Sequence, residues 1–128
     1  MKTTKLSNKI IMMFLLLLPA FSLFAKVTTV KYRCEEGETL TVSYFFGEAT
    51  DNATSTFDGW PHKMYLDESI SDQMISVYKE EPYILHVENA FNIKNAKLIS
   101  ITKQTNEPEN GDEKPYYELL YKNCIPGN

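Results

Sequence analysis

Two cysteines and two histidines are the residues of this 128-residue chain that could do redox, metal or acid–base chemistry. Cys34 and Cys124 stand far apart, and a four-ligand metal site would have to recruit both His62 and His86. His62 lies beside a tight turn, and His86 lies on the polar face of an alternating segment. We therefore interpret both histidines as surface or rim residues, and predict neither a metal site nor a cofactor.

Signals for catalysis are poor in this sequence. It holds no glycine-rich phosphate loop and no nucleophile elbow. We interpret the acid pairs 35–36 and 80–81 as solvated turns, and nothing brings two carboxylates together across a cleft, as a glycosidase requires. Asn52-Ala53-Thr54 matches a glycosylation acceptor, but the pattern is short and common. We predict no catalytic residue, and a protein that binds rather than an enzyme.

The first 25 residues are typical of a secretory signal peptide. Three lysines precede an unbroken apolar run over residues 10–18, and small residues follow Pro19. The run is shorter than the ~20 residues that a membrane-spanning helix needs. We predict a signal peptide over 1–25 with cleavage after Ala25, cleavage after Ser22 being the alternative. An uncleaved membrane anchor is the rival interpretation.

The remaining chain, residues 26–128, is acidic and holds both cysteines. The first 25 residues contain three of the 13 Lys and Arg and none of the 17 Asp and Glu, which leaves 26–128 with a net charge of −7. Such a charge argues against nucleic acid and anionic lipid as partners, and is compatible with a cationic partner or with plain solubility. In an oxidising compartment the natural pairing is a single Cys34–Cys124 disulfide.

Alternating apolar and polar residues dominate residues 26–128, which indicates strands rather than helices. Along 39–46, for example, Leu40, Val42 and Tyr44 share one face. Turn dipeptides such as Asp58-Gly59 separate the segments. The predicted strands cover residues 28–34, 39–46, 54–57, 60–66, 74–78, 83–87, 97–103 and 116–124. About eight short strands predict an all-β sandwich or barrel, and a bridge between the first and last strands favours closure. We predict one domain over 26–128.

Three segments carry a resemblance to a known family. An aromatic residue, Cys34, Gly37 three residues on, and an alternating strand ending in Tyr44 resemble the opening of the bacterial MliC/PliC-type inhibitors of c-type lysozyme. Residues 77–85 and 121–126 resemble the middle and the end of a relative of those inhibitors, the adhesin complex protein. The resemblance implies a small flattened eight-stranded antiparallel β-barrel with one disulfide. It also implies a periplasmic, outer-membrane-associated or secreted location in a Gram-negative bacterium.

The resemblance further implies inhibition of host c-type lysozyme by blocking the active-site cleft. In the inhibitors a loop serine and a downstream lysine enter that cleft, and the matching residues here are Ser69, Ser71 and Lys79. This loop departs from the family pattern, because it carries Asp67, Glu68 and Asp72 where the inhibitors have small residues and glycine. These acids would repel the target's catalytic carboxylates within the cleft, but would attract a basic rim.

The alternative function is that of a surface-associated adhesin or interaction protein that does not inhibit lysozyme and that contacts a host cell surface. An exposed aromatic patch around Trp60, Tyr65 and Phe91 would favour this alternative. The sequence leaves open whether the protein forms a homodimer.

Overall fold

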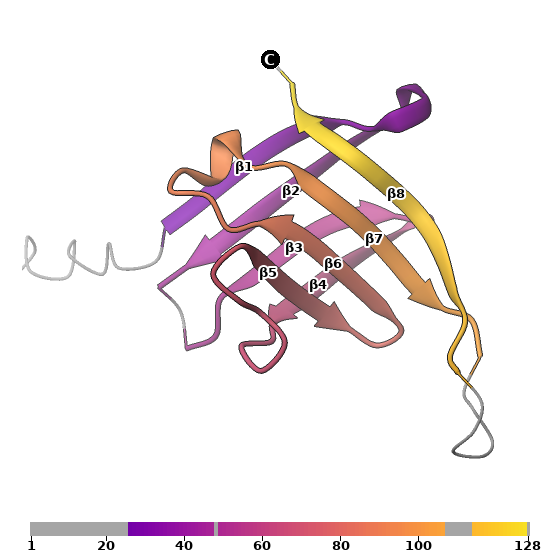
Figure 1. Cartoon of the computed structure of the whole chain (residues 1–128). Coiled ribbons are helices and arrows are strands. Elements are labelled where there is room, and N and C mark those ends of the chain that lie inside the picture. Colours follow the sequence, from indigo (N-terminus) through magenta and orange to yellow (C-terminus); the bar gives the residue numbers. More distant parts are fainter. Residues whose placement is uncertain (1–25, 48, 107–113, 128) are drawn as a thin grey trace, which may run out of the picture.

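The computed structural model describes residues 26–47, 49–106 and 114–127, and the predicted signal peptide over 1–25 lies outside them. In this part of the chain eight strands form a closed antiparallel barrel in which each strand pairs with the next and β8 returns to β1 (Figure 1). Their bounds are β1 Lys26–Arg33, β2 Thr39–Phe46, β3 Asn52–Phe57, β4 Trp60–Leu66, β5 Ile75–Glu80, β6 Tyr83–Glu88, β7 Leu98–Gln104 and β8 Tyr117–Pro126. Two short 3-10 turns, η2 Glu35–Gly37 and η3 Ile93–Asn95, complete the described elements.

The predicted fold class is confirmed as a small eight-stranded antiparallel β-barrel with one disulfide. The strands predicted over 39–46 and 60–66 have the observed bounds, and the other six begin and end within two residues of the prediction. Within the described ranges, no helix is long and apolar enough to span a bilayer.

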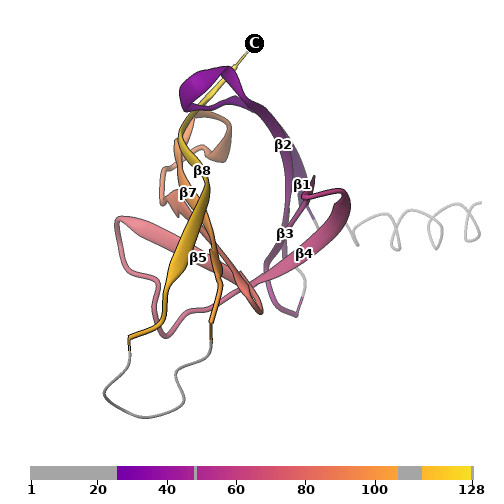
Figure 2. The same ribbon diagram turned by 90° about the vertical axis from the view of Figure 1, so that its right-hand side faces the viewer.

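The barrel consists of two four-stranded halves, β1–β4 and β5–β8, which Figure 2 shows on opposite sides of the molecule. Within the first half the ladder is long, and β1 pairs with β2 along all eight residues of each strand. Between the halves the ladders are short. β4 meets β5 at Tyr65↔Lys79 and Leu66↔Tyr78, and β1 meets β8 at two residue pairs. We call these two places the β4–β5 seam and the β1–β8 seam.

A disulfide lies beside the β1–β8 seam. Tyr32 pairs with Pro126 and Arg33 with Ile125, and Cys34, the next residue, is bonded to Cys124 with an S–S distance of 2.04 Å. Both cysteines are buried, so the bond is part of the core. The predicted Cys34–Cys124 disulfide is confirmed.

A carboxylate spans the β4–β5 seam where the two strands separate. Glu80 Oε2 accepts a hydrogen bond from the backbone N–H of Lys63 at 3.1 Å, and Glu80 Oε1 lies 2.8 Å from Nδ1 of His62. The β4 backbone therefore finds a side-chain partner from β5 where the ladder ends. The predicted solvated turn at Glu80 is wrong for this reason.

Alternate residues of the strands fill the barrel interior, as the period of two requires. Tyr32, Tyr44 and Tyr78 are its largest polar members, and the hydroxyls of Tyr32 and Tyr44 are 2.7 Å apart. Burial raises the pKa of Tyr32 and of Tyr78 to about 12. Tyr116 and Tyr117, where β8 begins, are instead exposed.

Candidate functional site

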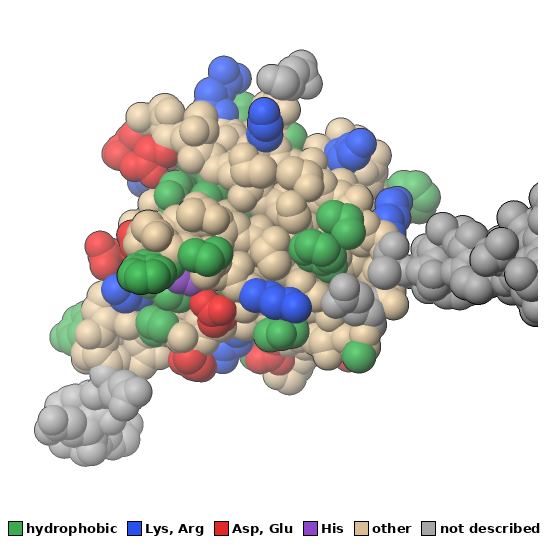
Figure 3. All heavy atoms as spheres, turned by 180° about the vertical axis from the view of Figure 1, so that it is seen from behind, with side chains coloured by type: hydrophobic (Ala, Val, Ile, Leu, Met, Phe, Trp, Pro, Cys, Tyr) green, Lys and Arg blue, Asp and Glu red, His purple; other side chains and the backbone are tan. Residues whose placement is uncertain are grey.

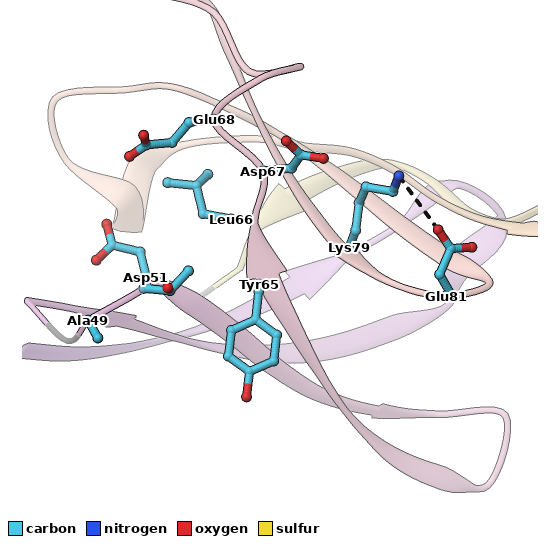
Figure 4. A pocket seen from close by; sticks show the side chains of 9 residues that line it. Ala49, Asp51, Tyr65, Leu66, Asp67, Glu68, Lys79 and Glu81 are labelled. Carbon is cyan, nitrogen blue, oxygen red and sulfur yellow. Dashed lines mark ion pairs between the residues drawn. The ribbon is translucent and has the colours of Figure 1, made fainter.

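An open hollow lies at one end of the β4–β5 seam, where the β2–β3 loop meets the start of the β4–β5 loop (Figure 4). Its volume is ≈ 730 Å³. The lining residues are Ala49, Thr50, Asp51, Tyr65, Leu66, Asp67, Glu68, Lys79 and Glu81. The hollow has room for side chains of a protein partner, and its walls come from segments that the barrel holds in place.

Backbone hydrogen bonds fix those segments. The N–H of Leu66 donates to the carbonyl of Asp51 at 2.9 Å, which ties β4 to the β2–β3 loop. One residue further on, the N–H of Asp67 donates to the carbonyl of Val77 at 2.8 Å, which ties the β4–β5 loop to β5. The hollow therefore forms where the short β4–β5 ladder gives way to loops.

The charge of the hollow is strongly acidic around a single cation. Among the described lining residues the carboxylates are Asp51, Asp67, Glu68 and Glu81, and the cation is Lys79. The Lys79 side chain is 33% exposed, and its Nζ lies 3.7 Å from Glu81 Oε1, the ion pair drawn in Figure 4. The excess of carboxylates gives this end of the barrel a negative potential, which attracts a basic partner surface.

Asp67 is the residue that organises the loop. A hydrogen bond from the Ser69 hydroxyl, with help from backbone N–H groups and the nearby Lys79, holds the pKa of Asp67 below its ordinary value. The Asp67 carboxylate accepts both the backbone N–H and the hydroxyl of Ser69. Asp67 is therefore ionised, and its charge is partly balanced within the loop.

The structure brings one of the three predicted contact residues into the hollow and leaves the two serines outside its lining. Lys79 lines it, whereas Ser69 lies exposed on the adjoining loop and is bonded to Asp67. The Ser71 hydroxyl donates to the carbonyl of Asp67 at 2.7 Å and accepts the N–H of Val77 at 2.9 Å. Ser71 thus holds the loop on β5 and has little left to offer a partner.

His62 corrects the sequence interpretation of a surface histidine. Its side chain is 7% exposed, stacks on Phe57 with ring centroids 3.9 Å apart, and has Nε2 3.1 Å from the Phe57 carbonyl. Together with its contact to Glu80, these partners make it a structural residue. His86 is half-buried, and burial lowers its pKa. Within the described residues, no group of three or more His, Cys, Asp and Glu side chains is placed to hold a metal ion.

The three aromatic residues of the alternative prediction are exposed but do not share one patch. Trp60 and Tyr65 lie at opposite ends of β4, and Phe91 lies in the loop between β6 and β7. The glycosylation motif is also inaccessible in the folded chain, because Asn52 is 1% exposed.

Comparisons with known proteins agree with this fold. Among solved structures, the adhesin complex protein from Neisseria meningitidis superposes with a TM-score of 0.62 at 22% identity, over 79% of this chain and 100% of that chain. PliC, the periplasmic inhibitor of c-type lysozyme from Salmonella typhimurium, gives a TM-score of 0.48 at 21% identity, over 80% of this chain and 100% of that chain. No curated protein sequence matches significantly.

A family-level match covers most of the chain. The sequence profile of the ACP-like domain matches residues 28–126, from the third residue of β1 to the last residue of β8. This range includes both cysteines and all of the barrel except the first two residues of β1. The chain therefore belongs to the ACP-like domain family.

Proposed function

We propose that this protein binds a host c-type lysozyme and inhibits it by presenting Lys79 and the surrounding acidic rim to the active-site cleft. The observation that carries the proposal is the half-buried lysine set among four carboxylates in an open hollow. A lysine ammonium in a partly dried cleft can form charge-assisted hydrogen bonds to the catalytic carboxylates of the enzyme.

The acidic residues have a separate role in this proposal. Asp51, Glu68 and Glu81 line the hollow around Lys79, where they would meet basic residues at the rim of the enzyme rather than its catalytic centre. Opposite charges on two approaching surfaces raise the rate of association and fix the orientation of the complex. The hydrogen bonds of Ser71 hold the loop in one shape, which lowers the entropic cost of binding.

The disulfide supports an exported protein, because such bonds form and persist in oxidising compartments. A periplasmic, outer-membrane-associated or secreted location would let the protein meet lysozyme before the enzyme reaches the cell wall.

A lysis assay tests the proposal. Purified protein is expected to protect a suspension of bacterial cell walls from hen egg-white lysozyme, and added salt is expected to weaken that protection. Lys79→Ala is expected to lower the potency about tenfold through the loss of a charge-assisted hydrogen bond. Lys94→Ala, an exposed lysine of η3 outside the hollow, is the matched control and keeps full potency. No protection at a large molar excess of the protein would refute the proposal.

A second candidate function is adhesion to a host surface without lysozyme inhibition. The observation that favours it is the pair of protruding aromatic residues at separate sites, Trp60 at 71% exposure and the fully exposed Phe91. Binding of labelled protein to host cells, set beside lysozyme capture, separates the two functions. If Trp60→Ala and Phe91→Ala abolish cell binding while lysozyme is not captured, adhesion replaces inhibition.

A further inference from the structure

The outer face of the β1–β4 half differs from the rest of this acidic protein. The four strands contain no aspartate and no glutamate, and they carry Lys26, Lys31, Arg33 and Lys63. Figure 3 views the molecule from this side, where the middle of the surface is mostly tan, the colour of hydroxyl side chains and backbone. Acidic side chains lie mainly at one corner, at one side and toward the lower edge of that view, and one lies beside a basic side chain below the centre. The charged residues that the four strands themselves contribute are all basic.

Hydroxyl groups form rows across the same face. The strand register places Thr29 beside Ser43, Ser43 beside Thr54, and Thr54 beside Lys63. Neighbouring strands are ~4.8 Å apart, so this row crosses all four strands over ~14 Å. Two residues before Ser43 on β2, Thr41 lies on the same face and pairs with Lys31 of β1. The face therefore offers hydroxyls at a regular spacing, with cations at its sides.

A hollow lies among these hydroxyl side chains, where β2 and β3 separate. The β2–β3 ladder ends at Val42↔Ser55, and beyond it the Ser55 hydroxyl donates to the Thr41 carbonyl at 2.6 Å. The resulting hollow of ≈ 490 Å³ is lined by Thr39, Leu40, Thr41, Ser43, Thr54, Ser55, Thr56, Pro61 and His62.

A second hollow of ≈ 610 Å³ adjoins the first and shares residues 39–41 with it. Lys31 and Arg33 line this second hollow, and neither has an ion-pair partner among the residues that the structure describes. The two hollows together form one trough, which we define by the residues lining either hollow. Threonine and serine hydroxyls line the first hollow of the trough, and the two unpaired cations, Lys31 and Arg33, line the second.

We propose that this trough binds an acidic polysaccharide, a polymer of carboxylated or sulfated sugars. The threonine and serine hydroxyls can exchange hydrogen bonds with sugar hydroxyls, since each is both donor and acceptor. Arg33 and Lys31 supply the charge for the acid groups, and a guanidinium pairs with a carboxylate or sulfate through two parallel bonds. Leu40 and Tyr32 in the lining are buried and Pro61 is exposed, so the trough offers little of the apolar surface that inserts into a lipid surface.

Two carboxylates set the end of the trough. Glu36 and Glu38 lie exposed in the β1–β2 turn next to Thr39, where they would repel an anionic chain. We therefore expect the ligand to extend from Arg33 along Thr41 toward Thr54 rather than over this turn, and Glu36→Gln/Glu38→Gln to bind more tightly than the wild type.

Fluorescence polarisation with a labelled heparin hexasaccharide tests the proposal on the full protein. Heparin and a polygalacturonate oligomer are expected to bind, and maltohexaose, a neutral chain of similar length, is expected not to. Lys31→Ala/Arg33→Ala is expected to weaken heparin binding about tenfold or more. The matched charge control, Lys94→Ala/Lys97→Ala, lies outside the trough and is expected to bind as the wild type does.

A second variant separates recognition of sugar hydroxyls from simple charge attraction. Thr41→Val/Thr56→Val keeps the shape and strand preference of both exposed residues and removes two hydroxyls, so a roughly fivefold or greater loss is expected with unchanged thermal unfolding. Unchanged binding in this variant would overturn the proposal, as would an equal loss in the charge control. Equal competition by phosphatidylglycerol vesicles would also overturn it, because the face would then respond to any anionic surface. Lysozyme inhibition is measured in parallel, and both the Lys31→Ala/Arg33→Ala and the Thr41→Val/Thr56→Val variants are expected to inhibit as the wild type does.

Discussion

The two seams of the barrel are equally short and are held by different chemistry. Each has two residue pairs in its ladder. The β1–β8 seam is held by the covalent bond from Cys34 to Cys124, whereas the β4–β5 seam is held by the Glu80 carboxylate, which reaches both Lys63 and His62. Each short ladder between the two halves is thus supported by side chains, the β1–β8 seam by a disulfide and the β4–β5 seam by a carboxylate.

The difference follows from the distance along the sequence that each clamp must close. Ninety positions separate the two cysteines, so the β1–β8 seam closes a long loop of chain. The His62–Glu80 contact spans 18 positions, and β4 and β5 are consecutive strands. Closing a longer loop costs more conformational entropy, and a covalent bond removes most of that cost from the unfolded state.

Removal of the disulfide is expected to have the largest effect on stability. Cys34→Ser/Cys124→Ser should lower the free energy of unfolding by about 4–5 kcal/mol, on the chain-entropy estimate for a loop of this length. Urea unfolding followed by tyrosine fluorescence measures the change, with reduced wild type as the control. An unfolding midpoint equal to that of the oxidised protein would show that the β1–β8 seam holds without its covalent clamp.

Alkaline pH is expected to weaken both seams. Tyr32 pairs with Pro126 at one seam and Tyr78 with Leu66 at the other, and burial raises both pKa values to about 12. Between pH 10 and 12 the folded state keeps phenolic protons that the unfolded state releases, so stability falls as pH rises through this range. One pKa unit corresponds to about 1.4 kcal/mol, so each tyrosine should contribute about 2.5 kcal/mol, which is less than the effect expected for the disulfide.

Urea unfolding midpoints measured between pH 8 and pH 12 check this prediction. Tyr32→Phe and Tyr78→Phe should each reduce the fall of the urea midpoint with pH, since each removes one titrating phenol. A midpoint that stays constant up to pH 12 in the wild type contradicts the expected linkage.

Loss of the Glu80 carboxylate is expected to have the smallest of the three effects. Glu80→Gln removes the charge of the carboxylate and one of its two acceptor oxygens, which should cost about 1–3 kcal/mol. Glu81→Gln is the matched control, because its exposed pair with Lys79 should contribute less than about 1 kcal/mol. Equal unfolding midpoints for the two variants would mean that Glu80 does not clamp the β4–β5 seam.

Local patterns were sufficient to predict the strands, because alternation depends on residues two positions apart. Leu40, Val42 and Tyr44 face the interior as the pattern predicts. Alternation does not predict the exposure of loop residues. Ile93 packs against the core, whereas Phe91, two residues earlier, is fully exposed.

The candidate site was predictable only in part, because its geometry depends on strand register. The resemblance predicted Lys79 as a contact residue, and the structure places it in the hollow. Whether the Ser71 hydroxyl is free cannot be read from sequence, since its partner is the N–H of Val77 across the loop. The same holds for His62, whose burial depends on Glu80 reaching across from β5. Four strands must likewise be aligned before the row from Thr29 to Lys63 can be seen.

The barrel closes where the first and last described strands meet, at two residue pairs and one disulfide. Seven of the pairings join consecutive strands, which can form one after another as the polypeptide is synthesised. The eighth pairing, between β8 and β1, needs Ile125 and Pro126, which are among the last residues that the structure describes. A chain cut before Cys124 would therefore lack both the β8 residues that pair with β1 and the disulfide, and it would keep Cys34 as a free thiol.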